Sequence, residues 1–586
     1  SLLLPFLLLP SFGIHSRFLL YPSSASSLAF NSGTMVVIAS SAGSSNNTSN
    51  TNTSLILGAA AVGGATCAVA WMKWKKDSME RKARAPIFDG IPIAEGGHWL
   101  FGHLILMNKD GDFRTGQEHN VVKYADENGL CSFWFLTRPA ISVLSGKDVK
   151  TVLNASSYRE SLKMLQIHTD NFLGPKALTT LMGKEWKLYR SAVHKSFTPA
   201  ALKQSQDVIN QIGTTLAKSI RSAIANDNAS GGVSYRAEVL PIMKMATIDV
   251  FGLSALGVDL ESCANLKPSP VAEAFDYLTD QYTLRLQSPL NPASSLYFLP
   301  TDANREHAQK IKLLRSFIAD LINKARADMD SGKEFRKTEF MSSLLKADGE
   351  KETMSNDAIS DIMMVLLFGG YDTTSITLAY ALYLLSKHPE VEQRAVAEIQ
   401  SVMGTGSSKK DLQDPDDLPY TKAVIMETLR LYPPAPVTTR NLEKDLVLHG
   451  KTIPKKTMAY VPIWSIQRYE GNYPRPDEFR PDRWVKRVSS NSENAVWDER
   501  YEGEEPDSRV EDYVPPANRD AFCAFSGGGR NCVGRALAIQ EAVTILACLL
   551  RDLKFECTVD YEVKPVLSSF IQRPDDNLPM VMKARD

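Results

Sequence analysis

The sequence lacks the charge excess, the cysteine pairs and the internal repeats that identify several classes of protein. Its 586 residues include 66 basic and 67 acidic residues, so the basic excess of a nucleic-acid-binding protein is missing. Seven cysteines occur without a single C-x-x-C pair, which argues against a zinc ribbon and gives no disulfide framework. With 44% hydrophobic and 23% charged residues the chain is otherwise typical of globular proteins. Length alone suggests about four domains.

Charge is also almost missing from the N-terminal end. Residues 1–54 contain one formally charged residue, Arg17, and form a leader or lumenal tail of low complexity. Residues 55–72 carry no charge, and 18 residues at 1.5 Å each give about 27 Å, close to a hydrocarbon layer of about 30 Å. Six basic residues follow between Lys73 and Arg84, which places the rest of the chain in the cytosol. We therefore predict a single transmembrane anchor at 55–72, with a buried core helix as the alternative.

The segments around the anchor give the expected domain organisation and location. Residues 73–92 are a basic hinge with Pro and Gly, and residues 93–586 form the catalytic body. An anchor of this orientation predicts a single-pass protein of the endoplasmic reticulum membrane. A plastid membrane stays open, because the Ser24–Phe30 segment resembles the cleavage motif of plastid-targeting leaders. Residues 489–512 hold nine acidic and two basic residues and are interpreted as an exposed insertion.

One of the seven cysteines stands out. Cys532 follows three consecutive glycines and precedes an apolar helical pattern that begins at Arg535. Free backbone N–H groups and the helix dipole favour a thiolate at such a position. A single thiolate with no second Cys or His nearby suits an axial ligand of haem iron better than zinc. A buried structural cysteine in a glycine turn is the alternative.

The residues around Cys532 resemble the F-x-x-G-x-R-x-C-x-G pattern of the cytochrome P450 family. The resemblance implies a mostly α fold with a small β region, built around one haem b with Cys532 as the iron ligand. It also implies that the other residues of the pattern contact the haem: Phe525, Gly528, Arg530 and Gly534.

A second matching segment lies inside a predicted long helix, Met354–Lys387, which Asn356 or Asp357 could cap. Two glycines in its middle lower the stability of the helix by about 2 kcal/mol relative to alanine. The alternative is therefore two shorter helices joined at these glycines. The middle, G-G-Y-D-T-T, resembles the oxygen-binding motif of the family. The resemblance implies that Thr373 contacts the oxygen molecule and that Asp372 helps to deliver protons.

Two further motifs agree with this order along the chain. Glu427 and Arg430 match E-x-x-R, and Arg483 lies in a segment similar to F-x-P-x-R-[FW]; the resemblance joins the three in a structural network. Trp186 and Arg190 match W-x-x-x-R. In the family these two residues meet a haem propionate, and the resemblance adds Arg440 and Arg530 as further propionate partners.

The resemblance implies a monooxygenase that inserts one atom of O2 into a small lipophilic substrate of the fatty acid, sterol or carotenoid class. We expect the electrons to come from a separate NADPH-cytochrome P450 reductase, because the 54 residues that follow Cys532 in this sequence are too few for a flavin domain. The alternatives are an O2-independent isomerase or dehydratase of lipid peroxides, and a non-enzymatic haem-binding membrane protein. The candidate substrate contacts are Tyr371, Val437, Thr438, Thr439 and Phe570.

Overall fold

The structure is a computed structural model that describes most of the chain from residue 87 onward. The described residues are 87–98, 102–103, 118, 121–136, 138–157, 169–227, 231–287, 299–331, 344–345, 354–487, 510–513, 518–558, 560–568 and 571–585. Residues 1–71 and 72–586 form two separate units, and every described residue belongs to the second. The predicted leader (1–54) and anchor (55–72) therefore lie outside the described residues, as do most of the hinge (73–92) and of the insertion (489–512).

Helices dominate the described part of the chain, which agrees with the predicted fold class. The α-helices are α4 (Gly146–Ala155), α6 (Gly183–Lys195), α7 (Pro199–Asn226), α8 (Val239–Phe251), α9 (Ser262–Asn265), α10 (Pro270–Gln287), α11 (Asp302–Asp330), α13 (Asn356–Lys387), α14 (Pro389–Met403), α15 (Pro419–Leu431), α16 (Ile463–Ile466) and α17 (Arg535–Asp552). Short 3-10 turns include η8 (Pro481–Trp484), η9 (Arg519–Ala521) and η10 (Gly528–Arg530), and a π-helical turn, η4 (Gly252–Leu256), ends α8.

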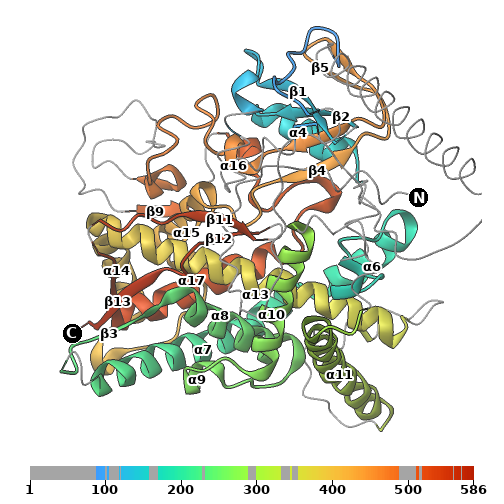
Figure 1. Ribbon diagram of the computed structural model, residues 1–586. Helices are drawn as coiled ribbons and strands as arrows, with labels where there is room; N and C mark the ends of the chain where they lie inside the picture. Colours follow the sequence, from blue (N-terminus) through green and yellow to red (C-terminus); the bar gives the residue numbers. More distant parts are fainter. Residues whose placement is uncertain are drawn as a thin grey trace, which may run out of the picture. The chain divides into compact units, whose positions relative to one another are not determined.

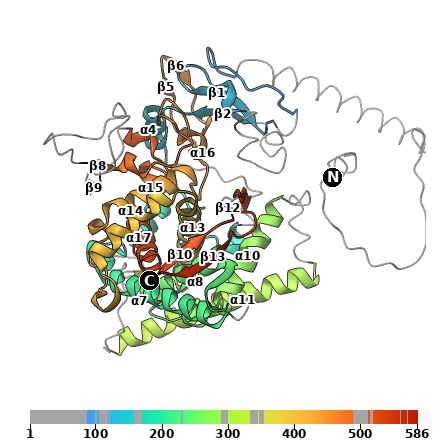
Figure 2. The same cartoon turned by 90° about the vertical axis from the view of Figure 1, so that its left-hand side faces the viewer.

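The strands form several small sheets. One sheet has the order β1-β2-β7-β4 and a second has the order β10-β13-β3, while β5-β6, β8-β9 and β11-β12 are two-stranded. Figures 1 and 2 place β1, β2 and β5 with α4 toward one end of the described body and α7, α8 and α11 toward the other. The strands are β1 (Leu130–Phe135), β2 (Arg138–Val143), β3 (Ser234–Glu238), β4 (Thr438–Asn441), β5 (Leu446–Leu448), β6 (Lys451–Ile453), β7 (Met458–Val461), β8 (Val485–Arg487), β9 (Val510–Tyr513), β10 (Leu553–Glu556), β11 (Pro565–Ser568), β12 (Ile571–Pro574) and β13 (Pro579–Ala584).

The central helix α13 is continuous, so the prediction of one long helix is confirmed and the two-helix alternative is wrong. Its cap differs from the expected Asn356 or Asp357. The Ser355 hydroxyl accepts the Ala358 N–H at 3.2 Å, which satisfies one of the free donors at the helix start. Ser355 was overlooked because three polar residues stand together at this end and each is a good cap.

Two hydrophobic cores meet along α13. The residues of α13 up to Tyr371 pack with α6, α10 and α11, whereas the residues from Ile376 onward pack with α7, α14, α15 and α17. Gly369, Gly370 and Thr373 lie near the junction of these two stretches and are exposed or half-buried on a mostly buried helix. The packing therefore leaves one face of the middle of α13 accessible.

Two apolar stretches among the described residues are long enough to cross a membrane. They are Val239–Leu256 and α13, and they are 78% and 72% buried inside the body. Such burial is expected of core helices, and α8 and α13 pack directly against each other.

Candidate active site

The loop before α17 is held in a constrained shape. Gly528 has a φ of +64°, and a Cβ there would lie 2.1 Å from the carbonyl oxygen of Leu153, so only glycine fits. Ser526 also has a positive φ, 57°, which is rare for a residue with a side chain. The Ser526 N–H donates to the Cys523 carbonyl oxygen at 2.7 Å and closes a turn. These contacts fix the loop before the chain reaches Cys532.

Cys532 is the accessible cysteine of the described part of the chain. Its N–H donates to the carbonyl oxygen of Phe525 at 2.9 Å, and the Gly534 N–H hydrogen-bonds to its sulfur. Helix α17 begins at Arg535, as predicted. The remaining described cysteines are buried or half-buried, as expected for packing residues: Cys131, Cys263, Cys523, Cys548 and Cys557.

The surroundings of the Cys532 sulfur shift the pKa of its thiol in two opposite directions. Part of its surface is accessible, yet the enclosing protein removes most of the water around the thiol and thereby raises its pKa. The Gly534 N–H and the charges of Arg190 and Arg535 oppose that rise. The helix N-terminus alone therefore does not lower the pKa of this thiol, although the sequence argument expected it to favour a thiolate. A metal ion bound to the sulfur would displace the proton.

Three predicted arginines gather around this loop. The Arg190 guanidinium on α6 donates to Asn531 Oδ1 at 2.7 Å, next to Cys532. Arg440 on β4 is fully buried, and its Nη2 donates to Ser526 Oγ at 3.1 Å and to the Gly527 carbonyl oxygen at 2.9 Å. These two side chains therefore connect α6 and the β-sheet to the loop.

The third arginine, Arg530, ties the loop to the segment before α6. It donates to the carbonyl oxygens of Ser157, Leu178 and Leu181 at 2.8, 3.1 and 2.7 Å. Its guanidinium lies 3.8 Å from the ring centroid of Trp186. Trp186 thus stacks on Arg530, a contact that the W-x-x-x-R motif did not predict.

The accessible face of α13 carries Thr373. The Thr373 hydroxyl donates to the Gly369 carbonyl oxygen at 2.5 Å, one turn earlier. A Cβ at Gly369 would meet no protein atom within 4 Å, and one at Gly370 would meet only Phe251, at 4.0 Å. The glycines therefore leave room beside the Thr373 hydroxyl.

Asp372 lies on a different face of α13, in a buried group of charges that the sequence did not reveal. Its Oδ1 is 3.0 Å from the Lys244 ammonium of α8, and the same ammonium is 2.6 Å from Asp276 Oδ1 of α10. The Tyr371 hydroxyl donates to Asp276 Oδ2 at 3.0 Å. We call Lys244, Asp276, Tyr371 and Asp372 the Lys244 cluster.

The Lys244 cluster shares one cation between two carboxylates. The side chains of Lys244 and Asp372 are 9% and 5% exposed, whereas that of Asp276 is 37% exposed. Desolvation raises the pKa of the Asp276 carboxyl; Lys244 lowers it and the Asp372 charge raises it. Desolvation lowers the pKa of Lys244, but the two carboxylates outweigh this and raise it. Lys244 therefore stays charged.

Tyr371 lies elsewhere than predicted. It was expected among the substrate contacts, but it is 1% exposed and packs edge-to-face on Phe275 of α10. Its neighbours Gly370 and Thr373 are on the accessible face, and the turn of the helix directs Tyr371 into the core instead. The G-G-Y-D-T-T motif by itself does not show that the Tyr371 side chain points into the core.

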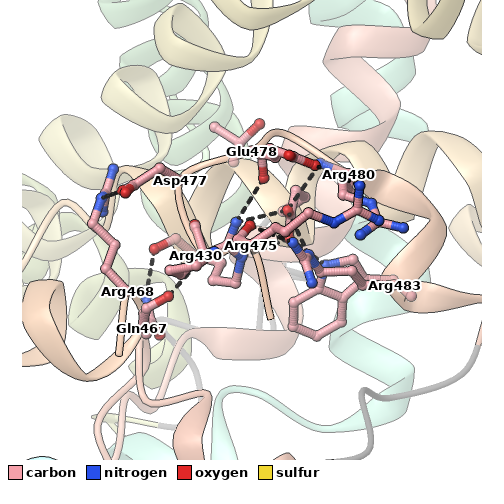
Figure 3. Close-up of polar contacts among 12 residues, drawn as sticks. Arg430, Gln467, Arg468, Arg475, Asp477, Glu478, Arg480 and Arg483 are labelled. Atoms are coloured by element: carbon pink, nitrogen blue, oxygen red, sulfur yellow. Dashed lines mark hydrogen bonds and ion pairs between the residues drawn. The ribbon is translucent and has the colours of Figure 1, made fainter. Parts of the chain in front are cut away.

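Glu427 and Arg430 on α15 form a fully buried pair, with Arg430 Nε and Nη2 each 2.8 Å from a Glu427 oxygen. Arg483 Nε, Trp484 Nε1 and the Arg480 N–H also donate to the Glu427 carboxylate, at 3.2, 2.9 and 2.9 Å (Figure 3). We call Glu427, Arg430, Arg483 and Trp484 the Glu427 cluster.

The rest of Arg430 binds the main chain. It donates to the carbonyl oxygens of Gln467, Pro476 and Glu478 at 2.8, 2.5 and 3.0 Å (Figure 3). Burial would raise the pKa of Glu427, but Arg430, Arg483 and the Trp484 hydrogen bond outweigh it and lower that pKa. The predicted three-residue network is present, and it includes backbone groups that no motif indicated.

Two segments that neighbour predicted substrate contacts are hydrogen-bonded to each other. The Gln572 N–H of β12 donates to the Pro434 carbonyl oxygen at 2.7 Å, just before Val437 and β4. Thr438 and Thr439 begin β4, and Val437 is partly buried against the β1-β2 region. Phe570 lies outside the described residues.

Paired strands flank most of the acidic insertion. Strand β8 pairs antiparallel with β9, with Val485 opposite Tyr513. The described residues on the two sides of 488–509 therefore lie side by side, next to the Glu427 cluster.

Comparison with known proteins agrees with these motifs. A family model described as Cytochrome P450 matches residues 92–579. The chain is 26% identical to Cytochrome P450 4V2 of Pongo abelii over 512 residues, 85% of this chain and 90% of that protein. It is 24% identical to Cytochrome P450 4c3 of Drosophila melanogaster (83% and 88% covered) and 26% identical to Cytochrome P450 3A6 of Oryctolagus cuniculus (79% and 86%).

Proposed function

The chain belongs to the cytochrome P450 monooxygenase family, and we propose that it oxidises a lipophilic organic substrate with Cys532 as the haem ligand. The observation that carries the proposal is the accessible Cys532 thiol, held by a constrained loop and influenced by the charges of Arg190 and Arg535, in a chain whose other described cysteines are buried or half-buried. The reaction places one oxygen atom of O2 in the product and reduces the other to water. It consumes two electrons and two protons.

The family implies a haem cofactor, and the residues present fit one. Cys532 supplies an accessible thiol ligand, Gly528 lets the loop pack closely on the Leu153 backbone, and Gly369 leaves room on α13. Haem b, when bound, supplies the oxygen activation. We propose that Arg190, Arg440 and Arg530, with Trp186, neutralise and hold its propionates, and that Phe525 and Gly534 shape the thiolate side.

The protein's own contribution to the chemistry is proton handling. We propose that Thr373 hydrogen-bonds the oxygen molecule and that Asp372 supplies protons from behind α13. While Asp372 is paired with Lys244 it is a carboxylate without a proton to give, so it must leave that ammonium and take up a proton from water before it can pass one to the Thr373 side. Lys244 thus controls when the acid is available.

We propose a substrate of the fatty acid, sterol or carotenoid class. The segment after Pro434 carries apolar and hydroxyl side chains, at Val437, Thr438 and Thr439. If these side chains line the substrate site, they suit a molecule that is mostly hydrocarbon with few polar groups. A screen of lipids by the spectral change of the purified haem protein would identify the class.

We propose NADPH-cytochrome P450 reductase as the electron donor, docking near Arg535. Arg535 is exposed in the first turn of α17, three residues after Cys532. If Arg535→Glu left reductase-supported turnover unchanged, this docking site would be wrong. We further propose attachment to the endoplasmic reticulum membrane through residues 55–72, with a plastid membrane as the alternative.

Labelled oxygen distinguishes a monooxygenase from an isomerase of lipid peroxides. Under ¹⁸O2, mass spectrometry should find one labelled atom in the product, whereas an isomerase would incorporate none. Thr373→Ala should lower product yield by about a hundredfold while NADPH still flows to hydrogen peroxide, because proton delivery fails. Thr377→Ala, one turn along α13 with its hydroxyl on the Thr373 carbonyl oxygen at 2.8 Å, is the matched control. A non-enzymatic haem protein would consume no NADPH.

A further inference from the structure

Gln467 is a fully buried amide at the end of α16, and every polar atom of it has a partner (Figure 3). Its Nε2 donates to the carbonyl oxygens of Leu429 and Arg430, at 3.0 and 2.9 Å. Its Oε1 accepts the Cys523 N–H at 3.0 Å. Its own carbonyl oxygen accepts from Arg430 Nη1 at 2.8 Å.

The donors of Gln467 bind the end of α15. The last carbonyl groups of a helix have no partner inside the helix. Gln467 satisfies two of them, at Leu429 and Arg430. The Arg430 side chain in turn donates to the carbonyl oxygen of Gln467. Gln467 is therefore fixed to the helix that carries the Glu427 cluster.

The acceptor of Gln467 binds the start of the cysteine loop. Cys523 is the first residue of the turn that Ser526 closes at 2.7 Å with a left-handed backbone. That turn leads directly to Phe525, whose carbonyl oxygen holds the Cys532 N–H. A bond at Cys523 therefore fixes the point from which the constrained loop departs.

We propose that Gln467 is a positioning residue that transmits the rigidity of the Glu427 cluster to the Cys532 loop. The inference rests on the proposed role of Cys532. A primary amide is suited to this position, because it offers two donors and an acceptor at once without charge. A carboxylate would face two carbonyl oxygens, and an apolar side chain would leave the Cys523 N–H buried and unpaired.

Gln467→Met tests the proposal, with Gln206→Met as the matched control. Gln206 on α7 is also a buried amide with all its hydrogen bonds made, to Leu412, Thr544 and Gln540, away from the loop. Both variants should lose thermal stability to a similar extent. Of the two variants, Gln467→Met alone should speed amide hydrogen exchange in residues 521–526. The expected increase is about tenfold, which corresponds to the loss of one buried hydrogen bond.

The holoenzymes should differ in spectrum as well. After reduction and addition of carbon monoxide, Gln467→Met should contain a fraction without the thiolate-type red shift, and Gln206→Met should contain none. Gln467→Glu keeps the Oε1 acceptor and should slow exchange at Cys523 relative to Gln467→Met, although its second oxygen faces the Leu429 and Arg430 carbonyl oxygens and should lower thermal stability. If Gln467→Met does not fold, Gln467→Asn, an uncharged amide that is one methylene shorter, takes its place in the comparison. Equal exchange and equal spectra for the two methionine variants would overturn the proposal. A wild type without the red shift would instead refute the proposed function.

Discussion

The Glu427 cluster is fully buried at its centre and the Lys244 cluster reaches solvent at Asp276, and the two are constructed in opposite ways. In the first, one carboxylate receives two guanidinium groups, an indole N–H and a backbone N–H, and the guanidinium groups also bind carbonyl oxygens. In the second, one ammonium is shared by two carboxylates from different helices. The Glu427 cluster has several donors for one carboxylate and is suited to hold a fixed geometry. Lys244, in contrast, can pair with either Asp276 or Asp372, and the proposed proton delivery by Asp372 requires such an exchange of partners.

Removing the central carboxylate should have the largest effect. Glu427→Ala leaves Arg430 and Arg483 buried without their counter-charge, which costs about 3–5 kcal/mol of folding free energy. We expect little folded holoenzyme, measured by thermal unfolding and haem content. Glu478→Ala is the control, because its carboxylate is half-exposed and, in the described part of the chain, is paired with Arg475 at the surface, a pair worth about 0–1 kcal/mol. Normal haem content in Glu427→Ala would show that the cluster does not hold the fold.

Removing the shared cation should have a smaller effect that depends on pH. Lys244→Met leaves Asp276 and Asp372 as neighbouring anions and should cost about 3 kcal/mol at neutral pH. The folded-state pKa of Asp276 is already raised, and losing Lys244 raises it further, so the native state binds more protons than the unfolded state. Stability should therefore fall as pH rises through that raised pKa, and return as pH falls toward about 4.

The free energy of unfolding, measured at several pH values, shows whether the stability of Lys244→Met falls as pH rises. Glu427 behaves oppositely, since its lowered pKa gives stability that is lost on acidification. Lys150→Met, which removes an exposed pair with Asp520, is the control for losing a lysine. If the loss of stability in Lys244→Met, relative to wild type, did not change with pH, the proposal that Asp276 and Asp372 share Lys244 would be wrong.

Removing one donor from the Glu427 cluster should cost less. Trp484→Phe deletes the Nε1 hydrogen bond to Glu427 at 2.9 Å and keeps an aromatic ring. A hydrogen bond to a buried charge contributes about 2 kcal/mol, and the other donors limit the damage. Chemical denaturation should show this loss with unchanged haem content; a loss as large as that of Glu427→Ala would mean that the ring, and not the bond, is essential.

The smallest effect belongs to the corresponding donor of the Lys244 cluster. Tyr371→Phe removes the hydroxyl bond to Asp276, whose carboxylate reaches solvent, so we expect a loss of about 1 kcal/mol. Tyr473→Phe is the control, because the Tyr473 hydroxyl is buried and has no partner in the described part of the chain. It should unfold like wild type or slightly later. A larger loss for Tyr473→Phe than for Tyr371→Phe would contradict these assignments.

The same contrast explains what the sequence could reveal. The Glu427 cluster depends on a pair three residues apart on one helix, so a short motif was sufficient to find it. The continuous α13 and the start of α17 followed from periodicity, Pro389 and the glycine loop. These are local properties of the chain.

Contacts between distant segments could not be found in this way. Lys244 and Asp276 lie on α8 and α10 and meet Asp372 only in the fold. The one signal was a single lysine in the apolar run of α8, Val239–Phe251. Gln467 gave no signal, because an amide has no charge, and its partners lie up to 56 residues away. The inward direction of Tyr371 likewise depends on the packing of α10.

The most direct test of the central claim is the spectrum of the reduced, carbon-monoxide-bound holoprotein in three forms. Wild type should show the thiolate-type red shift. Cys523→Ser, which changes a buried cysteine nine residues earlier, should keep it, and Cys532→Ser should lose it. A red shift that survives in Cys532→Ser, or one that is missing from wild type, would contradict the assignment of Cys532 as the haem ligand.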